Sequence, residues 1–456
     1  YCDYFSNTFN QTCHKIIHFL LADAKRVVGG GEREDRISKL PGNVMNRIVE
    51  LLPVEDAAKT SILSKKWRYI WARLPNLWLN RAFWIYCTTQ QIFRERVNTI
   101  LLQHLGDIEK FHLVESVRSS LYAHTDRWLV YVTRKGVKEL CLYMPDNRTY
   151  KVPSCVLNCP TLTHLELFKC LFKPPKSFVA FHHLINLRLQ RITFVPTTEF
   201  YVIDCPLLVN LALVDCRGTQ YLNIIVSSQL EHLVVHGCPY LDLNPFMNCK
   251  GLRKLQLEID KVLDCNPNPK QDERSTLEKL LLSVATTLEF LHMGLSCLEL
   301  LTADTISKCG PFASLQKLSL GIDLSKLHQT TCSLQLIKSC PNLSILQISV
   351  CASGDNAEAV LKYLDRPITC LDLRLNNLKY VVINCYECSK TELFFTKLLF
   401  ACVPSLERMY IEQKKAIDSR EESKIIKKLM CFLRASPSIF RIRKLRTTTY
   451  TSYIME

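Results

Sequence analysis

Cysteine is the residue type that could most readily support chemistry, because the chain has 22 cysteines among its 456 residues. Cys385 and Cys388 form a CxxC pair, a spacing that occurs in zinc sites. Tetrahedral zinc normally needs four ligands, and no second pair or nearby His-x-His set completes them. Other cysteines recur at one position of a repeating apolar pattern, as small buried side chains do. We therefore predict reduced, buried cysteines, with no metal and no cofactor.

Catalytic signatures are also missing from the sequence. It has no Gly-rich phosphate loop, no nucleophile-elbow serine, no HExxH motif and no distinctive pair of carboxylates. The polar residues His182, His183, Asp204 and Asp215 are predicted to lie in loops as ordinary exposed side chains. The sequence therefore predicts a protein that is not an enzyme.

The formal net charge of +15 suits an acidic protein, a nucleic acid or an anionic lipid, and the charge alone does not choose among them. Between residues 421 and 446 there are eight basic and two acidic residues, which could bind nucleic acid or an inositol phosphate. Ile425, Ile426, Leu429 and Met430 give the same segment an apolar stripe, which favours the solvated face of a packed helix. Nucleic acid is thus an unfavoured partner. No apolar run approaches the roughly 20 residues that a membrane helix needs.

Composition indicates a chain that is mostly folded, with 48% hydrophobic and 22% charged residues. Its length exceeds what one core usually serves, so we expect one small domain and one larger or repetitive domain. The apolar run from Ile16 to Ala22 after Lys15 resembles a secretion signal. Because the chain begins at Tyr1 without methionine, we treat residues 1–34 as an N-terminal extension and expect a cytosolic or nuclear protein.

Three short helical patterns follow one another between residues 35 and 80. Val44, Ile48, Leu51 and Leu52 fall on one face of a helix that Pro41 can begin. A second helix begins near residue 55, where acidic side chains suit the helix dipole. A third is expected after Ser64 as its cap, with an apolar face at the positions Trp67, Ile70, Trp71 and Leu74. Three such helices make a small core and tend to need a partner surface.

Beyond residue 100 the pattern L-x-x-L-x-L recurs, often followed by x-x-C. Its nine occurrences begin at Val137, Leu162, Leu184, Leu208, Leu230, Leu252, Leu288, Leu315 and Leu343. The starting positions from 162 to 252 are 22 or 24 residues apart, a period typical of leucine-rich repeats. Each unit would supply one short strand whose inward leucines are buried only by stacking on its neighbours. Cysteines such as Cys170, Cys216, Cys238 and Cys351 are predicted to be buried plugs, and the insertion from Asp264 to Arg274 is predicted to be a loop.

Residues 35–80 resemble the F-box of the plant F-box/FBD/leucine-rich-repeat family. The resemblance lies in Asp35-Arg-Ile-Ser-Lys-Leu-Pro41, in Asp56-Ala-Ala-Lys-Thr-Ser-Ile-Leu-Ser-Lys-Lys-Trp-Arg68 and in Leu74-Pro75. Gly42 departs from the family pattern, which usually has an acidic residue there. The resemblance implies that a set of mostly apolar residues packs against a Skp-type adaptor or fixes the F-box itself. These residues are Leu40, Pro41, Val44, Met45, Ile48, Leu52, Ala58, Ile62, Leu63 and Trp67.

The second part of the chain resembles the same family. The similarity includes Gly136 to Leu140, Pro153-Ser154 and Pro174-Pro175, and near the end Leu378 to Ile383 and Pro404 to Glu407, which resemble an FBD segment. It implies an α/β fold with a small three-helix F-box, a leucine-rich-repeat solenoid of horseshoe shape and a C-terminal FBD-like cap. The expected boundaries are 35–80 for the F-box, 100–365 for the repeat array and 366–446 for the FBD-like segment.

The family resemblance implies a non-catalytic substrate-recognition subunit of a Skp-cullin-F-box ubiquitin ligase. The F-box would bind the Skp-type adaptor and, through it, the cullin, while the repeats would hold an unidentified target protein for ubiquitylation. The competing hypothesis is a leucine-rich-repeat scaffold that binds a partner without degrading it.

Overall fold

The computed structural model describes a large part of the chain, in two compact units. The described residues are 39–114, 122–144, 150–173, 178, 181–195, 201–259, 269–351, 357–366, 375–413, 419–432, 435–436 and 439–444. In these ranges the first unit takes in 39–207 and 216–223, and the second takes in 208–215 and 224–444. The N-terminal extension, the first four residues of the F-box motif, the Pro174-Pro175 pair and parts of the FBD-like segment lie outside the described residues.

The first unit begins with two of the three helices expected for the F-box. Helix α2 spans Gly42–Glu50 and α3 spans Val54–Lys59, followed by the 3₁₀ turn η1 at Thr60–Ile62. The prediction of a third helix after Ser64 is wrong. Residues 65–70 form turns, and only Trp71–Arg73 form a short 3₁₀ helix, η2. This segment is shorter than a self-sustaining α-helix, and its bonds join residues three apart, as in the Trp67 N–H to Ser64 carbonyl contact of 3.1 Å.

Parallel strands follow the F-box directly. Five of them are adjacent in the order β1 (Asn76–Leu79), β2 (Lys110–Val114), β3 (Glu139–Tyr143), β5 (His164–Phe168) and β7 (Asn186–Gln190). The first two precede the predicted repeats, and their sequences show the same pattern at Leu74/Leu77/Leu79 and Ile108/Phe111/Leu113. Strand formation therefore begins at the end of the predicted F-box, with no intervening linker.

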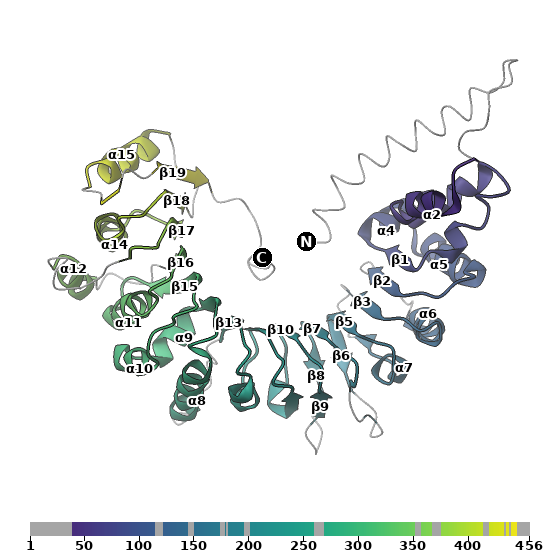
Figure 1. Ribbon diagram of the computed structural model, residues 1–456, viewed down its shortest axis with the longest axis horizontal. Coiled ribbons are helices and arrows are strands. Elements are labelled where there is room, and N and C mark those ends of the chain that lie inside the picture. Colours follow the sequence, from purple (N-terminus) through teal and green to yellow (C-terminus); the bar gives the residue numbers. More distant parts are fainter. Residues whose placement is uncertain are drawn as a thin grey trace, which may run out of the picture. The chain divides into compact units, whose positions relative to one another are not determined.

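The connections of the first unit are helical at first and then extended. The helices are α4 (Arg81–Cys87), α5 (Gln90–Gln103), α6 (Tyr122–Arg134) and α7 (Ser154–Leu157). The short strands β4 (Tyr150–Lys151), β6 (Cys170–Phe172) and β8 (Thr193–Phe194) form a second parallel sheet, and β9 spans Tyr201–Cys205 with η3 at Thr219–Tyr221. In Figure 1, α6 and α7 lie on one side of strands β3 and β5, so the side chains of these strands divide between a buried and an open face.

The second unit repeats the same arrangement. Its long parallel sheet has the order β10 (Asn210–Val214), β12 (His232–His236), β13 (Lys254–Glu258), β14 (Phe290–Met293), β15 (Lys317–Asp323), β16 (Ile345–Cys351), β17 (Tyr380–Tyr386), β18 (Arg408–Gln413) and β19 (Ile439–Lys444). The connecting helices are η4 (Asn244–Asn248), α8 (Pro269–Val284), α9 (Leu295–Leu300), α10 (Ala303–Lys308), α11 (Leu327–Lys338), α12 (Glu358–Leu364), α14 (Lys390–Cys402) and α15 (Ser419–Met430). Strand β11 spans Leu222–Val226. Helices α8, α11 and α14 lie on one side of the strands in Figure 1.

Register explains how the repeated leucines form a core. Leu140 pairs with Leu165 and Leu165 with Leu187, and all three are 2% exposed. In the second unit Leu255, Leu291 and Leu318 are paired in the same way and fully buried. Each contributes roughly 1.5 to 3 kcal/mol, so the stability of each sheet is collective. The repeat prediction is confirmed, and parallel sheets of this kind are consistent with a solenoid.

The cysteines after the strands are buried, with one exception. Cys170, Cys216 and Cys238 are at most 3% exposed, and each thiol lies 3.3 to 3.5 Å from the carbonyl oxygen of a strand residue. The prediction of a buried cysteine is wrong for Cys351, which is half-buried. Strand β16 is longer than strands such as β12 and includes this residue. The predicted loop from Asp264 is also corrected, since α8 begins at Pro269, a residue suited to the first helical turn.

Strands β17, β18 and β19 lie within the segment predicted to be an FBD-like cap. They continue the parallel pairing of β16, with Leu346 opposite Val381 and Val381 opposite Met409. All three side chains are fully buried. The segment is thus built like the repeats before it, and its role as a cap stays a prediction.

Candidate partner-binding surface of the N-terminal module

The predicted adaptor-binding residues divide into a surface set and a core set. Val44 is 39% exposed and Ile62 is 77% exposed, and Pro41 is also exposed. The half-buried members are Leu40, Ile48, Leu52, Ala58 and Leu63. Met45 and Trp67 are 6% and 1% exposed, so they can only fix the module itself. Eight of the ten predicted residues are therefore available to a partner.

Within residues 39–75, two exposed large apolar residues were absent from the predicted contact set. Leu51 is 41% exposed and Tyr69 is 59% exposed. Leu51 follows Val44 by seven residues, and this helical spacing places both on one face of the helix and the turn that ends it. The sequence signal for Leu51 was thus present, whereas the exposure of Tyr69 depends on how residues 65–70 turn.

The core of this module is formed by the tryptophans. Trp67 and Trp71 are 1% and 8% exposed, and Leu74 beside them is 5% exposed. The resemblance left Trp67 open between adaptor contact and core, and the structure places both Trp67 and Trp71 in the core. The Ser64 hydroxyl has no hydrogen-bond partner among the described residues, so its predicted role as a helix cap is wrong, as no α-helix follows it.

No side chain caps the N-terminus of helix α2. Its N-cap is Pro41, no side chain accepts a capping hydrogen bond, and no acidic residue lies in the first turn. Gly42 occupies that turn with no atom within 4 Å of where a Cβ would lie. An acidic side chain at position 42 would fit and would interact favourably with the helix dipole. Gly42, which departs from the family pattern, lacks this stabilising interaction.

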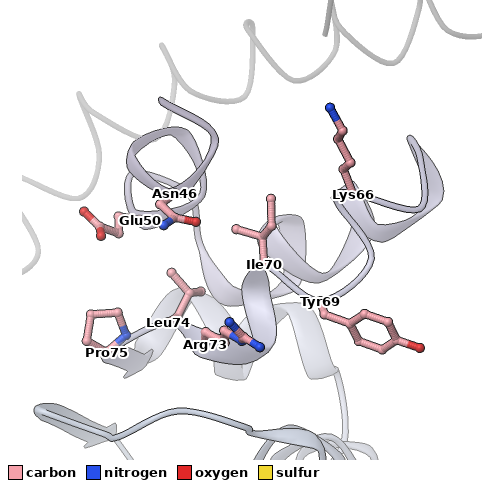
Figure 2. Close-up of a pocket in the computed structure, with 8 residues that line it drawn as sticks. All are labelled: Asn46, Glu50, Lys66, Tyr69, Ile70, Arg73, Leu74 and Pro75. Carbon is pink, nitrogen blue, oxygen red and sulfur yellow. The ribbon is translucent and has the colours of Figure 1, made fainter. Parts of the chain in front are cut away.

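A cleft of about 330 Å³ lies between α2 and residues 66–75. It is lined by Asn46, Glu50, Lys66, Tyr69, Ile70, Arg73, Leu74 and Pro75. Figure 2 shows Asn46 and Glu50 on α2, across from Ile70 and Leu74, with the Tyr69 ring extending away from α2. Its polar lining is one carboxylate, two cations, an amide and a phenol.

A buried histidine joins the end of this module to the first repeat. His104 is 4% exposed, and its Nε2 lies 2.9 Å from the Leu74 carbonyl oxygen while its Nδ1 lies 3.0 Å from that of Gly106. The Leu105 N–H donates to the Ala72 carbonyl oxygen at 2.8 Å. The partner surface and the first strands are thereby held as one body within the first unit.

The open face of the strands carries aromatic pairs. Trp78 on β1 stacks on His112 of β2 with ring centroids 3.9 Å apart, and Tyr143 on β3 stacks on Phe168 of β5 at the same distance. Trp78 and Tyr143 are 41% and 38% exposed. Burial lowers the pKa of His112 to about 4, so its ring is neutral at physiological pH.

The remaining polar residues considered for chemistry are His182, His183, Asp204 and Asp215. His182 and His183 are exposed as predicted, but Asp204 lies half-buried in strand β9 rather than in a loop. Asp215 is half-buried and its carboxylate lies 3.2 Å from Nδ1 of His236. In the described ranges no group of three or more His, Cys, Asp or Glu side chains is arranged to hold a metal, and Cys385 and Cys388 gather no further ligands there.

The basic C-terminal helix is amphipathic. On α15, Ile425 and Leu429 are 7% and 0% exposed, whereas Lys424, Lys427 and Lys428 are exposed. The stripe therefore packs inward at Ile425 and Leu429, whereas Met430 is 66% exposed, and the prediction of a solvated helix face is confirmed for the three lysines. Among the helices that the structure describes, none has the length and apolar character to cross a membrane.

Two family models match the chain over these same regions. A model described as F-box domain matches residues 37–79, which include α2, α3 and β1. A model described as At1g61320/AtMIF1, LRR domain matches residues 100–454. The second match therefore includes the strands from β2 onward and the segment predicted to be FBD-like.

Several proteins of Arabidopsis thaliana are similar in sequence. The F-box/FBD/LRR-repeat protein At1g13570 is 37% identical over 188 residues, or 40% of this chain and 45% of that protein. The putative F-box/LRR-repeat protein At5g02930 is 24% identical over 419 residues, or 83% of this chain and 87% of that protein. The F-box/LRR-repeat protein At3g26922 is 28% identical over 299 residues, or 60% of this chain and 94% of that protein. The chain thus spans about half the length of the first relative and most of the other two.

Proposed function

The chain belongs to the F-box/leucine-rich-repeat protein family, and from this we propose that it is the substrate-recognition subunit of a Skp-cullin-F-box ubiquitin ligase. Proteins of this family are typically non-catalytic adaptors, and an F-box domain implies binding to a Skp-type adaptor. The cullin would be reached through that adaptor. The repeats would hold the target protein, in the cytosol or the nucleus.

The observation that carries this proposal is the apolar surface of the F-box. Val44, Leu51 and Ile62 are between 39% and 77% exposed although they belong to one small module. Burying such side chains stabilises a complex by roughly 1.5 to 3 kcal/mol each before the costs of association. Exposed apolar groups that cluster on one module are typical of a protein-binding surface.

The proposal places the target on the open face of the strands. Helices cover one side of a sheet of parallel strands, and side chains such as Trp78 and Tyr143 point away from the core on the other. Aromatic side chains with partly exposed rings are the residues that most often anchor protein interfaces. In the first unit this face begins at β1, immediately after the F-box.

The direct test is binding of the full chain to a purified Skp-type adaptor. We expect the wild type to bind and the double variant Val44→Asp/Leu51→Asp to lose at least 100-fold in affinity, because two charges would enter an apolar contact. The matched control is Leu282→Asp, a similarly exposed leucine on α8 of the second unit, which should bind like the wild type.

A folded wild-type chain that binds no Skp-type adaptor would exclude the ligase function. The competing scaffold function would then account for the chain, since its repeats could bind a partner without the adaptor. If the adaptor binds, ubiquitylation of a captured target in a reconstituted ligase separates a degradative receptor from a scaffold.

A further inference from the structure

Helix α4, which follows the first strand, presents two large apolar side chains to solvent. Ile85 is 65% exposed and Tyr86 is 39% exposed. The helix is fixed in this orientation at its start, where the Asn80 side chain accepts hydrogen bonds from two backbone N–H groups at 3.0 and 3.2 Å. Phe83 and Cys87, one helical turn apart, bury the opposite face. The exposed face of α4 is therefore a property of the folded helix and not of a frayed end.

Tyr86 lies between one cation of the F-box and one cation of helix α5. Nζ of Lys59, at the end of α3, lies 5.0 Å from the centroid of the Tyr86 ring. The Arg96 guanidinium of α5 lies 4.3 Å from the same centroid, and it donates to the Tyr86 carbonyl oxygen at 3.4 Å. Such cation–π contacts hold the tyrosine in place between the F-box and the first repeat.

Lys59 also connects Tyr86 to the predicted adaptor surface. Ile62 follows Lys59 by three residues in a continuous run of helical turns, so both side chains lie on one side of α3 and η1. Ile62, one of the predicted adaptor-binding residues, is 77% exposed. An apolar and cationic strip therefore runs from Ile62 over Lys59 to Tyr86 and Ile85.

We propose that the adaptor-binding surface continues along this strip, so that a Skp-type adaptor contacts α4 of the first repeat as well as the F-box. The inference rests on the proposed ligase function and extends it to residues outside the F-box. The occupant is the adaptor itself, because the strip is continuous with the surface assigned to the adaptor and lies on the same rigid unit. His104 contributes to this rigidity, since it holds the end of η2 against the end of α5.

The charge of the surface defines the chemistry of the part of the adaptor that covers it. Residues 39–75 contain seven basic and three acidic side chains, a net formal charge of +4. Lys59, which is one of these seven and lies 2.7 Å from the Asp56 carboxylate, borders the exposed apolar pair, and Arg96 adds one further cation there. The complementary surface is an apolar pocket for Ile85 bordered by carboxylates, and its binding should weaken as salt rises.

The test measures the dissociation constant of the full chain for the purified adaptor in wild type, Ile85→Asp, Tyr86→Ala and the control Leu282→Asp. We expect Ile85→Asp to weaken binding at least 10-fold, Tyr86→Ala several-fold, and the control to leave it unchanged. Lys59→Ala should reduce the dependence of affinity on salt. Ile85→Ser provides a milder variant in case the aspartate disturbs folding, which tryptophan fluorescence would report.

The possible outcomes distinguish a failure of this inference from a failure of the proposed ligase function. If Val44→Asp/Leu51→Asp abolishes binding while both α4 variants bind within twofold of the wild type, the adaptor surface ends at the F-box and the inference is wrong. If the folded wild type binds no adaptor, the ligase function and the inference fail together. Loss of affinity in Ile85→Asp at wild-type stability supports the inference.

Discussion

Replacing His104 by alanine should destabilise the first unit by about 3 kcal/mol. The ring is 4% exposed, and its two nitrogens lie 2.9 and 3.0 Å from carbonyl oxygens of Leu74 and Gly106. A neutral imidazole has one N–H and so donates to one of these carbonyls; losing that hydrogen bond costs about 0.5 to 1.5 kcal/mol, and the carbonyl left buried without a partner costs about 1 to 3 kcal/mol. The void left by the imidazole adds to this loss.

Tryptophan fluorescence during urea unfolding is a selective assay for this change. The five tryptophans all belong to the first unit, at Trp67, Trp71, Trp78, Trp84 and Trp128. The midpoint of their transition should move to lower urea in His104→Ala, in proportion to the lost free energy.

The control is His183→Ala, which removes an exposed imidazole from the same unit and should change stability by less than about 0.5 kcal/mol. A loss below about 1 kcal/mol in His104→Ala would show that the junction between the F-box and the first repeat does not depend on this histidine. Such a small loss would refute the stabilising role assigned to the contacts of this ring with the two carbonyls.

Three further changes test the core of each unit. Gly218→Ala should cost at least about 2 kcal/mol by the same fluorescence assay, because its φ is +73° and an added methyl would overlap a backbone carbonyl oxygen. Burial raises the pKa of Cys297 to about 12, so its thiol should stay unmodified by iodoacetamide at pH 8.5 in the folded chain while the exposed Cys431 reacts, and equal rates would contradict this. Because the pKa of Cys297 is higher in the folded chain, its neutral thiol contributes fully to the free energy of unfolding below pH 9. This contribution is lost as pH rises through about 12. Leu429→Ala should cost about 2 to 5 kcal/mol and Lys427→Ala less than about 0.5 kcal/mol in thermal unfolding followed by circular dichroism, and similar losses would argue against the inward stripe of α15.

The periodic part of the fold could be predicted from sequence because its cause is local. Each L-x-x-L-x-L unit places its leucines on one side of a short strand, and only stacking with the next unit buries them. Leu165, Leu187 and Leu318 are accordingly buried and in register. The same rule applied to Leu77 and Phe111 would have placed the first strand at the end of the F-box, where the structure has β1.

The F-box motif determined which residues gather in the N-terminal module, but only tertiary structure decided which of them a partner can reach. Val44 and Met45 are neighbours in one helix, and Met45 is 6% exposed whereas Val44 is 39% exposed. Helical periodicity gives the two faces and does not say which neighbour covers each one. The turns at residues 65–70 likewise follow from packing of Trp67 and Trp71, which outweighs the helical pattern of the segment.

The spacing of residues in the sequence could not predict contacts between residues that are distant in sequence. His104 meets the Leu74 carbonyl across 30 residues, and Lys59 and Arg96 meet at Tyr86 from two different helices. No local pattern marks such pairs, because their proximity depends on how the strand β1 returns the chain to the F-box. The sequence by itself therefore determined the family, the repeats and the apolar positions, whereas the tertiary structure decided the exposed surface, because exposure depends on what packs against each side chain.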